Sequence, residues 1–169
     1  NNAVQQYGRR NIIEISGIPK SIPNANLESA VIDIMSAIDI KVEPDNFEAV
    51  HRLSAKSSKT IVRFVNRKIC IEALRNRKKM KTSAQSIGFD KSIVYVNENL
   101  TDFNNEIAYR CRRLKKSKLI DNTYSMNGIV YIMKIGENKR TKILHIDELK
   151  EMFPDFADFQ SDSSILLMQ

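Results

Sequence analysis

Short runs of β-branched residues alternate with helical stretches through the first hundred positions, and this alternation constrains the fold more than any other feature. Strand-like runs occupy 12–15, 47–53, 60–65 and 92–96. Apolar positions at helical spacing fill 27–38, which Asn24 or Asn26 can cap, and 67–80. The order of elements is therefore β-α-β-β-α-β, and we expect a fold of the α+β class.

This order is the split arrangement of ferredoxin-like domains, which RNA-recognition motifs share, and it predicts such a domain over 11–98. Thr101 then caps a further helix, Asn127-Gly128 turns a hairpin, and Pro154 ends a short helix. We therefore expect a small α-β-β-β-α C-terminal domain over 99–154. Two segments remain: 1–10, either the end of an upstream helix or coiled coil or a frayed terminus, and 155–169, an acidic, loosely attached tail.

The basic residues are concentrated in one part of the chain. The 169 residues carry a formal charge of +7, but 67–118 hold 14 basic and 5 acidic side chains, whereas 119–169 hold 5 and 8. The helix dipole accounts for one or two cations at each helix end, and solvated faces are the alternative. Clusters of five and six are typical of a surface that binds a polyanion. The candidate phosphate contacts are all five cations of the first cluster, Arg75, Arg77, Lys78, Lys79 and Lys81. In the second cluster, which also contains Lys115 and Lys118, they are Arg110, Arg112, Arg113 and Lys116.

Other function classes find little support. The five glycines form no phosphate-binding loop, and Cys70 and Cys111 lack metal-ligand spacing and are expected to be buried thiols. His51 and His145 have no evident catalytic partner. The acidic residues at 147, 148 and 151 suit a helix N-terminus. No apolar run approaches the length of a bilayer span. We expect a soluble, intracellular, non-enzymatic protein with no catalytic residues, no metal and no cofactor.

The stacking aromatics of RNA-recognition motifs are absent from the strands that usually carry them. The corresponding positions hold Glu14, Lys59 and Ile61. Alternation along the third strand sends Val62 and Phe64 to the core and Arg63 to the open face, where it is a phosphate-contact candidate. Tyr95 on the fourth strand can stack or be buried, and burial is favoured. Affinity should then rest on backbone charge more than on base reading.

Several short motifs, in this order and spacing, resemble the nucleic-acid-binding half of LINE retrotransposon first-open-reading-frame proteins and the related baculovirus few-polyhedra (FP) protein. They are Tyr7-Gly8-Arg9-Arg10-Asn11, Ile13-Glu14-Ile15-Ser16-Gly17-Ile18-Pro19, Val50-His51-Arg52-Leu53, Ile61-Val62-Arg63-Phe64 and Val96-Asn97-Glu98-Asn99-Leu100-Thr101. The resemblance implies an unusual RNA-recognition fold and a small C-terminal domain that bind a single strand in the basic cleft between them. It also implies a homotrimer through an upstream coiled coil.

The resemblance implies binding arginines at Arg63, at Arg75 or Arg77, and at one of Arg110, Arg112 and Arg113. The chain departs from the family in that last helix, because the retrotransposon proteins place their arginine pair near 107–109. The leading hypothesis is a sequence-tolerant RNA- or single-stranded DNA-binding chaperone that coats retroelement or viral RNA. It would act in a cytoplasmic ribonucleoprotein, with the nucleus as a second location. The alternative is a protein-interaction or assembly module that uses the same basic face.

Overall fold

A computed structural model gives the fold of the chain and describes residues 1–80, 89 and 93–160. Its contacts divide the chain into two compact units, one of residues 1 and 3–99 and one of residues 2 and 100–169. Each unit combines helices with an antiparallel sheet, so the α+β class is confirmed. Among the described residues, no helix is both long and apolar enough to cross a bilayer.

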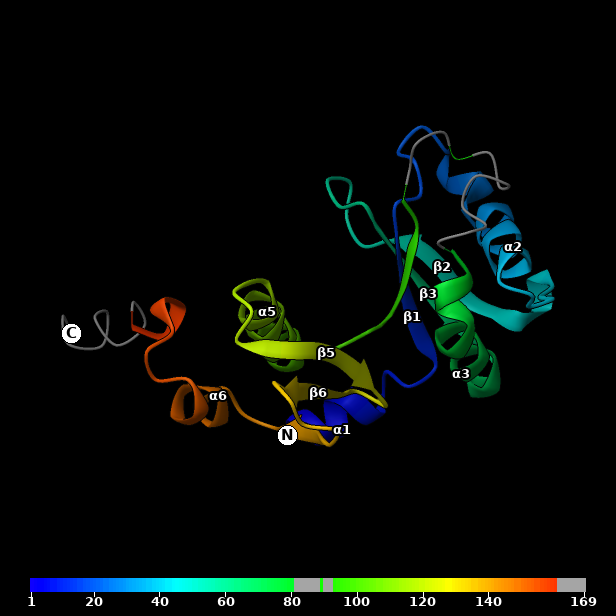
Figure 1. The fold of residues 1–169 in the computed structure, drawn as a ribbon. Helices are drawn as coiled ribbons and strands as arrows, with labels where there is room; N and C mark the ends of the chain where they lie inside the picture. Colours follow the sequence, from blue (N-terminus) through cyan, green and yellow to red (C-terminus); the bar gives the residue numbers. More distant parts are fainter. Residues whose placement is uncertain (81–88, 90–92, 161–169) are drawn as a thin grey trace. The chain divides into compact units, whose positions relative to one another are not determined.

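The first unit contains one four-stranded sheet and the predicted alternation of strands and helices (Figure 1). Its order along the chain is α1 (Asn2–Tyr7), β1 (Ile12–Ser16), η1 (Asn24–Asn26), α2 (Leu27–Ala37), η2 (Pro44–Asn46), β2 (Phe47–Arg52), β3 (Lys59–Phe64), α3 (Arg67–Asn76), η3 (Arg77–Lys79) and β4 (Tyr95–Glu98). The strands lie in the order β2-β3-β1-β4, and each neighbouring pair is antiparallel. Both α2 and α3 lie on the same side of this sheet (Figure 1).

Alternate residues of the central strands form the core of this unit. Ile13 and Ile15 of β1 and Val62 and Phe64 of β3 are fully buried and pack with the apolar positions of α2. Each such side chain contributes roughly 1.5–3 kcal/mol by leaving water. The predicted inward positions of β3 are confirmed. Asn26, by contrast, makes no capping bond, because a 3-10 turn precedes α2.

Gly17 follows β1 and lies against the backbone of Ile93 and Val94, just before β4. Its φ of +97° lies in the left-handed region, which side chains rarely adopt. A Cβ atom at this position would stand 2.1 Å from the carbonyl oxygen of Ile93. The two backbones therefore meet at a distance that only glycine permits.

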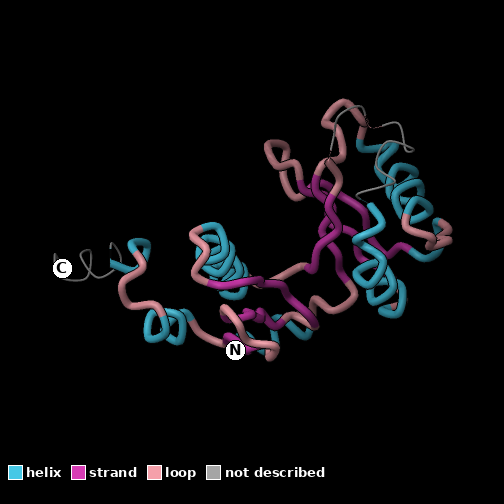
Figure 2. The backbone as a smooth tube through the Cα atoms, viewed as in Figure 1, coloured by secondary structure: helices cyan, strands magenta, loops and turns pink. Residues whose placement is uncertain are grey.

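The second unit begins with a helix and continues with three strands and a short helix (Figure 2). Its elements are α5 (Asp102–Lys116), β5 (Ile120–Met126), β6 (Ile129–Lys134), β7 (Arg140–Ile143) and α6 (Ile146–Met152). The sheet order is β5-β6-β7. Thr101 caps α5 by accepting from the N–H of Asn104 at 3.2 Å, as predicted. Asn127 and Gly128 both have positive φ, which confirms the predicted hairpin turn.

Residues 155–160 are attached to the core of the second unit, so the expectation of a loose tail is wrong for them. Phe159 is only 3% exposed and belongs to the same buried cluster as Ile107, Cys111 and Leu114 of α5. Asp158 forms an ion pair with Arg113 on α5. An acidic and aromatic sequence can thus cover a basic helix. Residues 161–169, the rest of the predicted tail, lie outside the described part of the chain.

Candidate nucleic-acid interface

The end of α3 and the following η3 turn carry the first group of cations. Arg75, Lys78 and Lys79 are exposed and Arg77 is half-buried. Lys79 forms an ion pair with Asp39, with 2.8 Å between Nζ and Oδ2. Among the described residues no ion pair engages the other three. We call Arg75, Arg77, Lys78 and Lys79 the α3 cluster; the predicted Lys81 lies outside the described residues.

The backbone beneath the α3 cluster is held by buried contacts. Asn76 Nδ2 donates to the carbonyl of Ile38 at 2.9 Å, and this bond ties the end of α3 to the end of α2. Met80, directly after η3, is only 2% exposed and packs in the core. The cations are therefore displayed from a fixed turn. Such a turn can contact several phosphates of one strand without first being ordered.

On the open face of the first sheet, Glu14 is engaged within the unit. It is 8% exposed, and Asn99 Nδ2 donates to its Oε1 at 2.9 Å. Lys59 Nζ stands 3.5 Å from Oε2, and Arg9 Nη1 donates to the Asn99 side-chain oxygen at 2.9 Å. This network satisfies the carboxylate. Glu14, which the sequence predicts at the stacking position of an RNA-recognition motif, is thus a paired acid.

Tyr95 lies on the open face, and the prediction that it is buried is wrong. It is 53% exposed and pairs with Ser16 of β1, whereas Val94 and Val96 are each 3% exposed and face the core. Arg63 lies on the same face as predicted, half-buried and opposite Ile12. The face therefore offers the exposed ring of Tyr95 together with cationic side chains.

The second group of cations, on α5, is partly used inside its own unit. Arg110 Nε donates to Glu106 at 2.8 Å, and its Nη1 donates to the carbonyl of Asp158 at 3.2 Å. Arg113 holds the Asp158 carboxylate through two nitrogens, and its hydrogen bond and charge lower the pKa of Asp158. These two arginines of α5 fix residues 155–160 to the helix. Their charge is partly neutralised before any ligand arrives.

Two further cations of α5 share a face with an exposed aromatic ring. Tyr109, Arg112 and Lys116 follow the spacing i, i+3, i+7, so they form one stripe, here called the α5 stripe. Tyr109 is 47% exposed, and Arg112 and Lys116 are exposed. Sequence reasoning chose the two cations and missed the tyrosine. The helical spacing from Arg112 and Lys116 was the signal that could have identified it.

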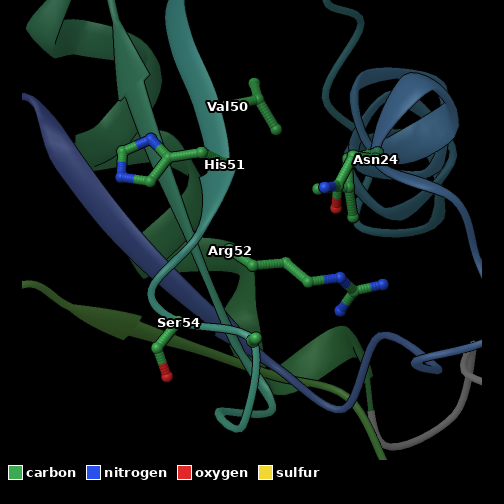
Figure 3. A pocket seen from close by; sticks show the side chains of 7 residues that line it. Asn24, Val50, His51, Arg52 and Ser54 are labelled. Carbon is green, nitrogen blue, oxygen red and sulfur yellow. The ribbon is translucent and has the colours of Figure 1, made fainter.

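A cavity of about 450 Å³ lies beside β2 and the start of α2, away from the predicted contacts. Figure 3 shows Arg52 reaching from β2 toward the side where Asn24 lies, while His51 projects to the other side of the strand. Arg52 Nη2 donates to the carbonyls of Pro19 at 3.0 Å and Ile22 at 2.9 Å. Arg52 thus fastens the loop after β1.

Three of the groups considered for catalysis and metal binding, Cys70, Cys111 and Glu148, take part in packing or in a helix cap. Burial raises the pKa of Cys70 to about 12 and that of Cys111 to about 11, so both thiols stay protonated. Glu148 Oε1 accepts from the N–H groups of Leu144 and His145, each at 3.0 Å, and caps α6. The described part of the chain holds no group of three potential metal ligands.

Comparison with known proteins gives one similarity to an RNA-processing protein. The mitochondrial 15S rRNA processing factor CCM1 of Kluyveromyces lactis is 27% identical over 116 residues. The aligned part is 68% of this chain, and it spans only 12% of the length of that protein. No family model matches the chain.

Proposed function

We propose that this chain is a non-enzymatic protein that binds single-stranded RNA or DNA with little sequence preference and acts as a nucleic-acid chaperone. The observation that carries the proposal is the α3 cluster, in which Arg75, Arg77 and Lys78 stand on a fixed turn and make no ion pair among the described residues. Crowded cations repel one another and destabilise a fold that has no anion to neutralise them. A phosphate backbone supplies such an anion.

The arrangement of the first unit supports an RNA-recognition-type fold of the ferredoxin-like kind. The antiparallel order β2-β3-β1-β4, with both helices on one side, is what the split β-α-β-β-α-β order should produce. Glu14 replaces a stacking aromatic, so the fold would be a non-canonical member. We propose that this unit is related to the LINE first-open-reading-frame and FP proteins, because the motifs that resemble theirs occur in the same order as these strands and helices.

The side chains favour backbone contacts over base reading. Cations at the α3 cluster, at Arg63 and on the α5 stripe can each meet a phosphate, and phosphate contacts do not depend on sequence. Tyr95 and Tyr109 can stack on any base, because every base has a π-face. The two units are one chain, so a strand held by one meets the other at a high effective concentration. This coupling would let weak contacts coat a long RNA, including retroelement or viral RNA.

Two further parts of the proposal rest on smaller observations. The rRNA-processing role in the name of the Kluyveromyces protein favours RNA as the ligand and a ribonucleoprotein as the setting. Val4 and Tyr7 of α1 are 69% and 62% exposed, so they can pack against the helices of other copies. Together with the resemblance to the LINE proteins, this exposure leads us to propose a homotrimer through an upstream coiled coil, which would multiply the binding sites.

The salt dependence of binding tests the proposal most directly. Fluorescence anisotropy with a labelled oligouridine, measured between about 50 and 200 mM salt, should give a straight line of log K against log salt. Neutralising five phosphates predicts a slope of roughly −3.5 for a single strand. An affinity that does not change with salt, or no binding at low salt, would overturn the proposal.

A second candidate function is a protein-interaction module that uses the same basic face. Leu53 and Ile93 are 54% and 66% exposed beside the open face of the first sheet, and exposed apolar side chains of this kind occur at protein interfaces. An acidic protein partner would then neutralise the cations. Release of a captured partner by excess oligouridine would support nucleic acid as the ligand of this face. No competition would favour the protein-interaction module.

A further inference from the structure

The three-stranded sheet of the second unit has two faces of different composition. Val130, Ile132 and Ile143 are buried on one face, and the apolar side chains of both α5 and α6 belong to the same buried cluster. The strand register places another set of side chains on the opposite face. These are Asn122, Tyr124 and Met126 of β5, Ile129, Tyr131 and Met133 of β6, and Arg140 and Lys142 of β7. We call this set the tyrosine face.

Two tyrosines and an arginine form a layered group on the tyrosine face. Tyr124 and Tyr131 lie directly opposite each other, with their ring centroids 5.6 Å apart and their planes 26° apart. The guanidinium carbon of Arg140 stands 4.3 Å from the centre of the Tyr131 ring. Arg140 Nη1 also donates to the thioether sulfur of Met126 at 3.8 Å. These contacts hold the exposed guanidinium in one place, with Tyr124 half-exposed beside it.

Sheet stability accounts for part of this arrangement. A cross-strand pair of aromatic rings stabilises an antiparallel sheet, and an arginine over a ring adds to it. Sheet stability does not explain the excess of positive charge on this face. The tyrosine face carries two exposed cations and no carboxylate, although residues 119–169 hold eight acidic side chains against five basic ones. Among the described residues, neither Arg140 nor Lys142 forms an ion pair.

We propose that the tyrosine face is a further binding site for single-stranded nucleic acid, in addition to the α3 cluster and the α5 stripe. A base stacks on the guanidinium of Arg140 and contacts the edge of the Tyr124 ring. Lys142 contacts a neighbouring phosphate. Proteins stack unpaired bases both on aromatic rings and on arginine planes, and cations beside the stack hold the backbone. This inference rests on the proposed function, because it takes a single strand as the ligand.

The test removes the two cations of the tyrosine face in the full chain. Arg140→Ala with Lys142→Ala should weaken binding of a labelled oligouridine about tenfold, because one stack and one phosphate contact are lost. The slope of log K against log salt should become shallower by roughly 0.7, the value for one lost phosphate contact on a single strand. Lys41→Ala with Lys56→Ala is the charge-matched control, since both lysines are exposed and lie outside every proposed contact. The control should bind nearly as wild type does.

Two more measurements separate stacking from charge and from folding. Arg140→Lys keeps the charge and loses the planar group, so the salt slope should stay close to that of wild type while the affinity falls. Photocrosslinking of 4-thiouridine RNA to the wild-type chain should label the peptide that contains Tyr124. This labelling needs no variant, so it remains informative if Arg140→Ala fails to fold.

These experiments distinguish a failure of this inference from a failure of the proposed function. If wild type binds, the α3 cluster variants bind weakly, and the tyrosine-face double variant matches its control with no crosslink at Tyr124, this inference alone is wrong. If wild type binds no oligonucleotide at low salt, the proposed function and this inference fail together.

Discussion

The two groups of cations look alike in the sequence and differ in the structure. In the α3 cluster, only Lys79 is engaged by a carboxylate through an ion pair among the described residues, and that carboxylate is the single exposed Asp39. On α5, Arg110 and Arg113 are bound to Glu106 and to residue 158. The two groups have a similar density of basic residues, but, among the described candidate contacts, more of those in the α3 cluster form no ion pair and can bind a ligand.

The difference follows from what lies near each helix. Residues 155–160 return to α5, and Phe159 enters its core while Asp158 meets Arg113. No comparable segment is described at the end of α3, where Met80 turns inward and the cations stay outside. A count of basic residues therefore overestimates the binding surface of α5 more than that of the α3 cluster.

Removing the aromatic anchor of residues 155–160 should have the largest effect, and it concerns stability. Phe159→Ala should lower the free energy of unfolding of the second unit by about 3 kcal/mol, because a buried ring is replaced by a cavity. Chemical denaturation monitored by circular dichroism measures the change. Asp155→Ala, at an exposed neighbour, is the control and should change little. Equal stability of the two variants would mean that the segment does not anchor to α5.

Removing the α3 cluster should weaken nucleic-acid binding most. Replacing Arg75, Arg77, Lys78 and Lys79 by Ala should reduce the affinity roughly 100-fold at low salt, since up to four phosphate contacts are lost. The loss should be equal for oligouridine and for an unrelated mixed sequence, as anisotropy titrations can measure. A loss confined to one sequence would indicate that these residues read bases.

Two double variants of α5 should separate its two kinds of cation. Arg112→Ala with Lys116→Ala should weaken binding roughly fivefold and leave the melting temperature unchanged, because neither side chain forms a hydrogen bond or an ion pair with another described residue. Arg110→Ala with Arg113→Ala should lower the melting temperature and affect binding less, because the bonds to residue 158 are lost. Anisotropy and thermal denaturation on the same preparations measure both. The reverse pattern would contradict the contrast drawn here.

The ion pair of Asp158 should give the smallest effect, visible as a dependence on pH. Arg113 lowers the pKa of this carboxyl in the folded state, so the pair stabilises the protein above the ordinary pKa of about 4 and is lost as pH falls through the lower folded value. Asp158→Asn should therefore melt below wild type at neutral pH, and the difference should shrink in acid. A difference that persists below both pKa values would assign the effect to something other than ionisation.

The parts of the fold that could be predicted are those with a strong local signal. The alternation of apolar residues correctly placed Val62 and Phe64 in the core. Thr101 and Asn127-Gly128 correctly predicted a helix start and a hairpin turn, because few residue types suit those backbone positions. Tyr95 could not be placed in this way. With Val94 and Val96 on either side, the side that faces the helices depends on pairing with β1, which is a long-range contact.

The sequence predicted which cations belong to the candidate site, but it did not predict which of them are paired with other side chains. The sequence places Arg112 and Arg113 side by side, but a helix turns by about 100° per residue, so they face different surroundings. One meets solvent and the other meets Asp158, which is 45 positions away. The tyrosine face was missed for a similar reason. Tyr124, Tyr131 and Arg140 form one surface only after three strands are in register.

The close approach at Gly17 carries a consequence for the evolution of the first unit. A side chain there would collide with the main chain of Ile93, and main chain cannot be exchanged by substitution elsewhere. Homologues that keep this strand arrangement should keep glycine at this position even where the surrounding cations and aromatics have diverged. A lineage could therefore change what the open face binds, through residues such as Tyr95, while this one position stays invariant.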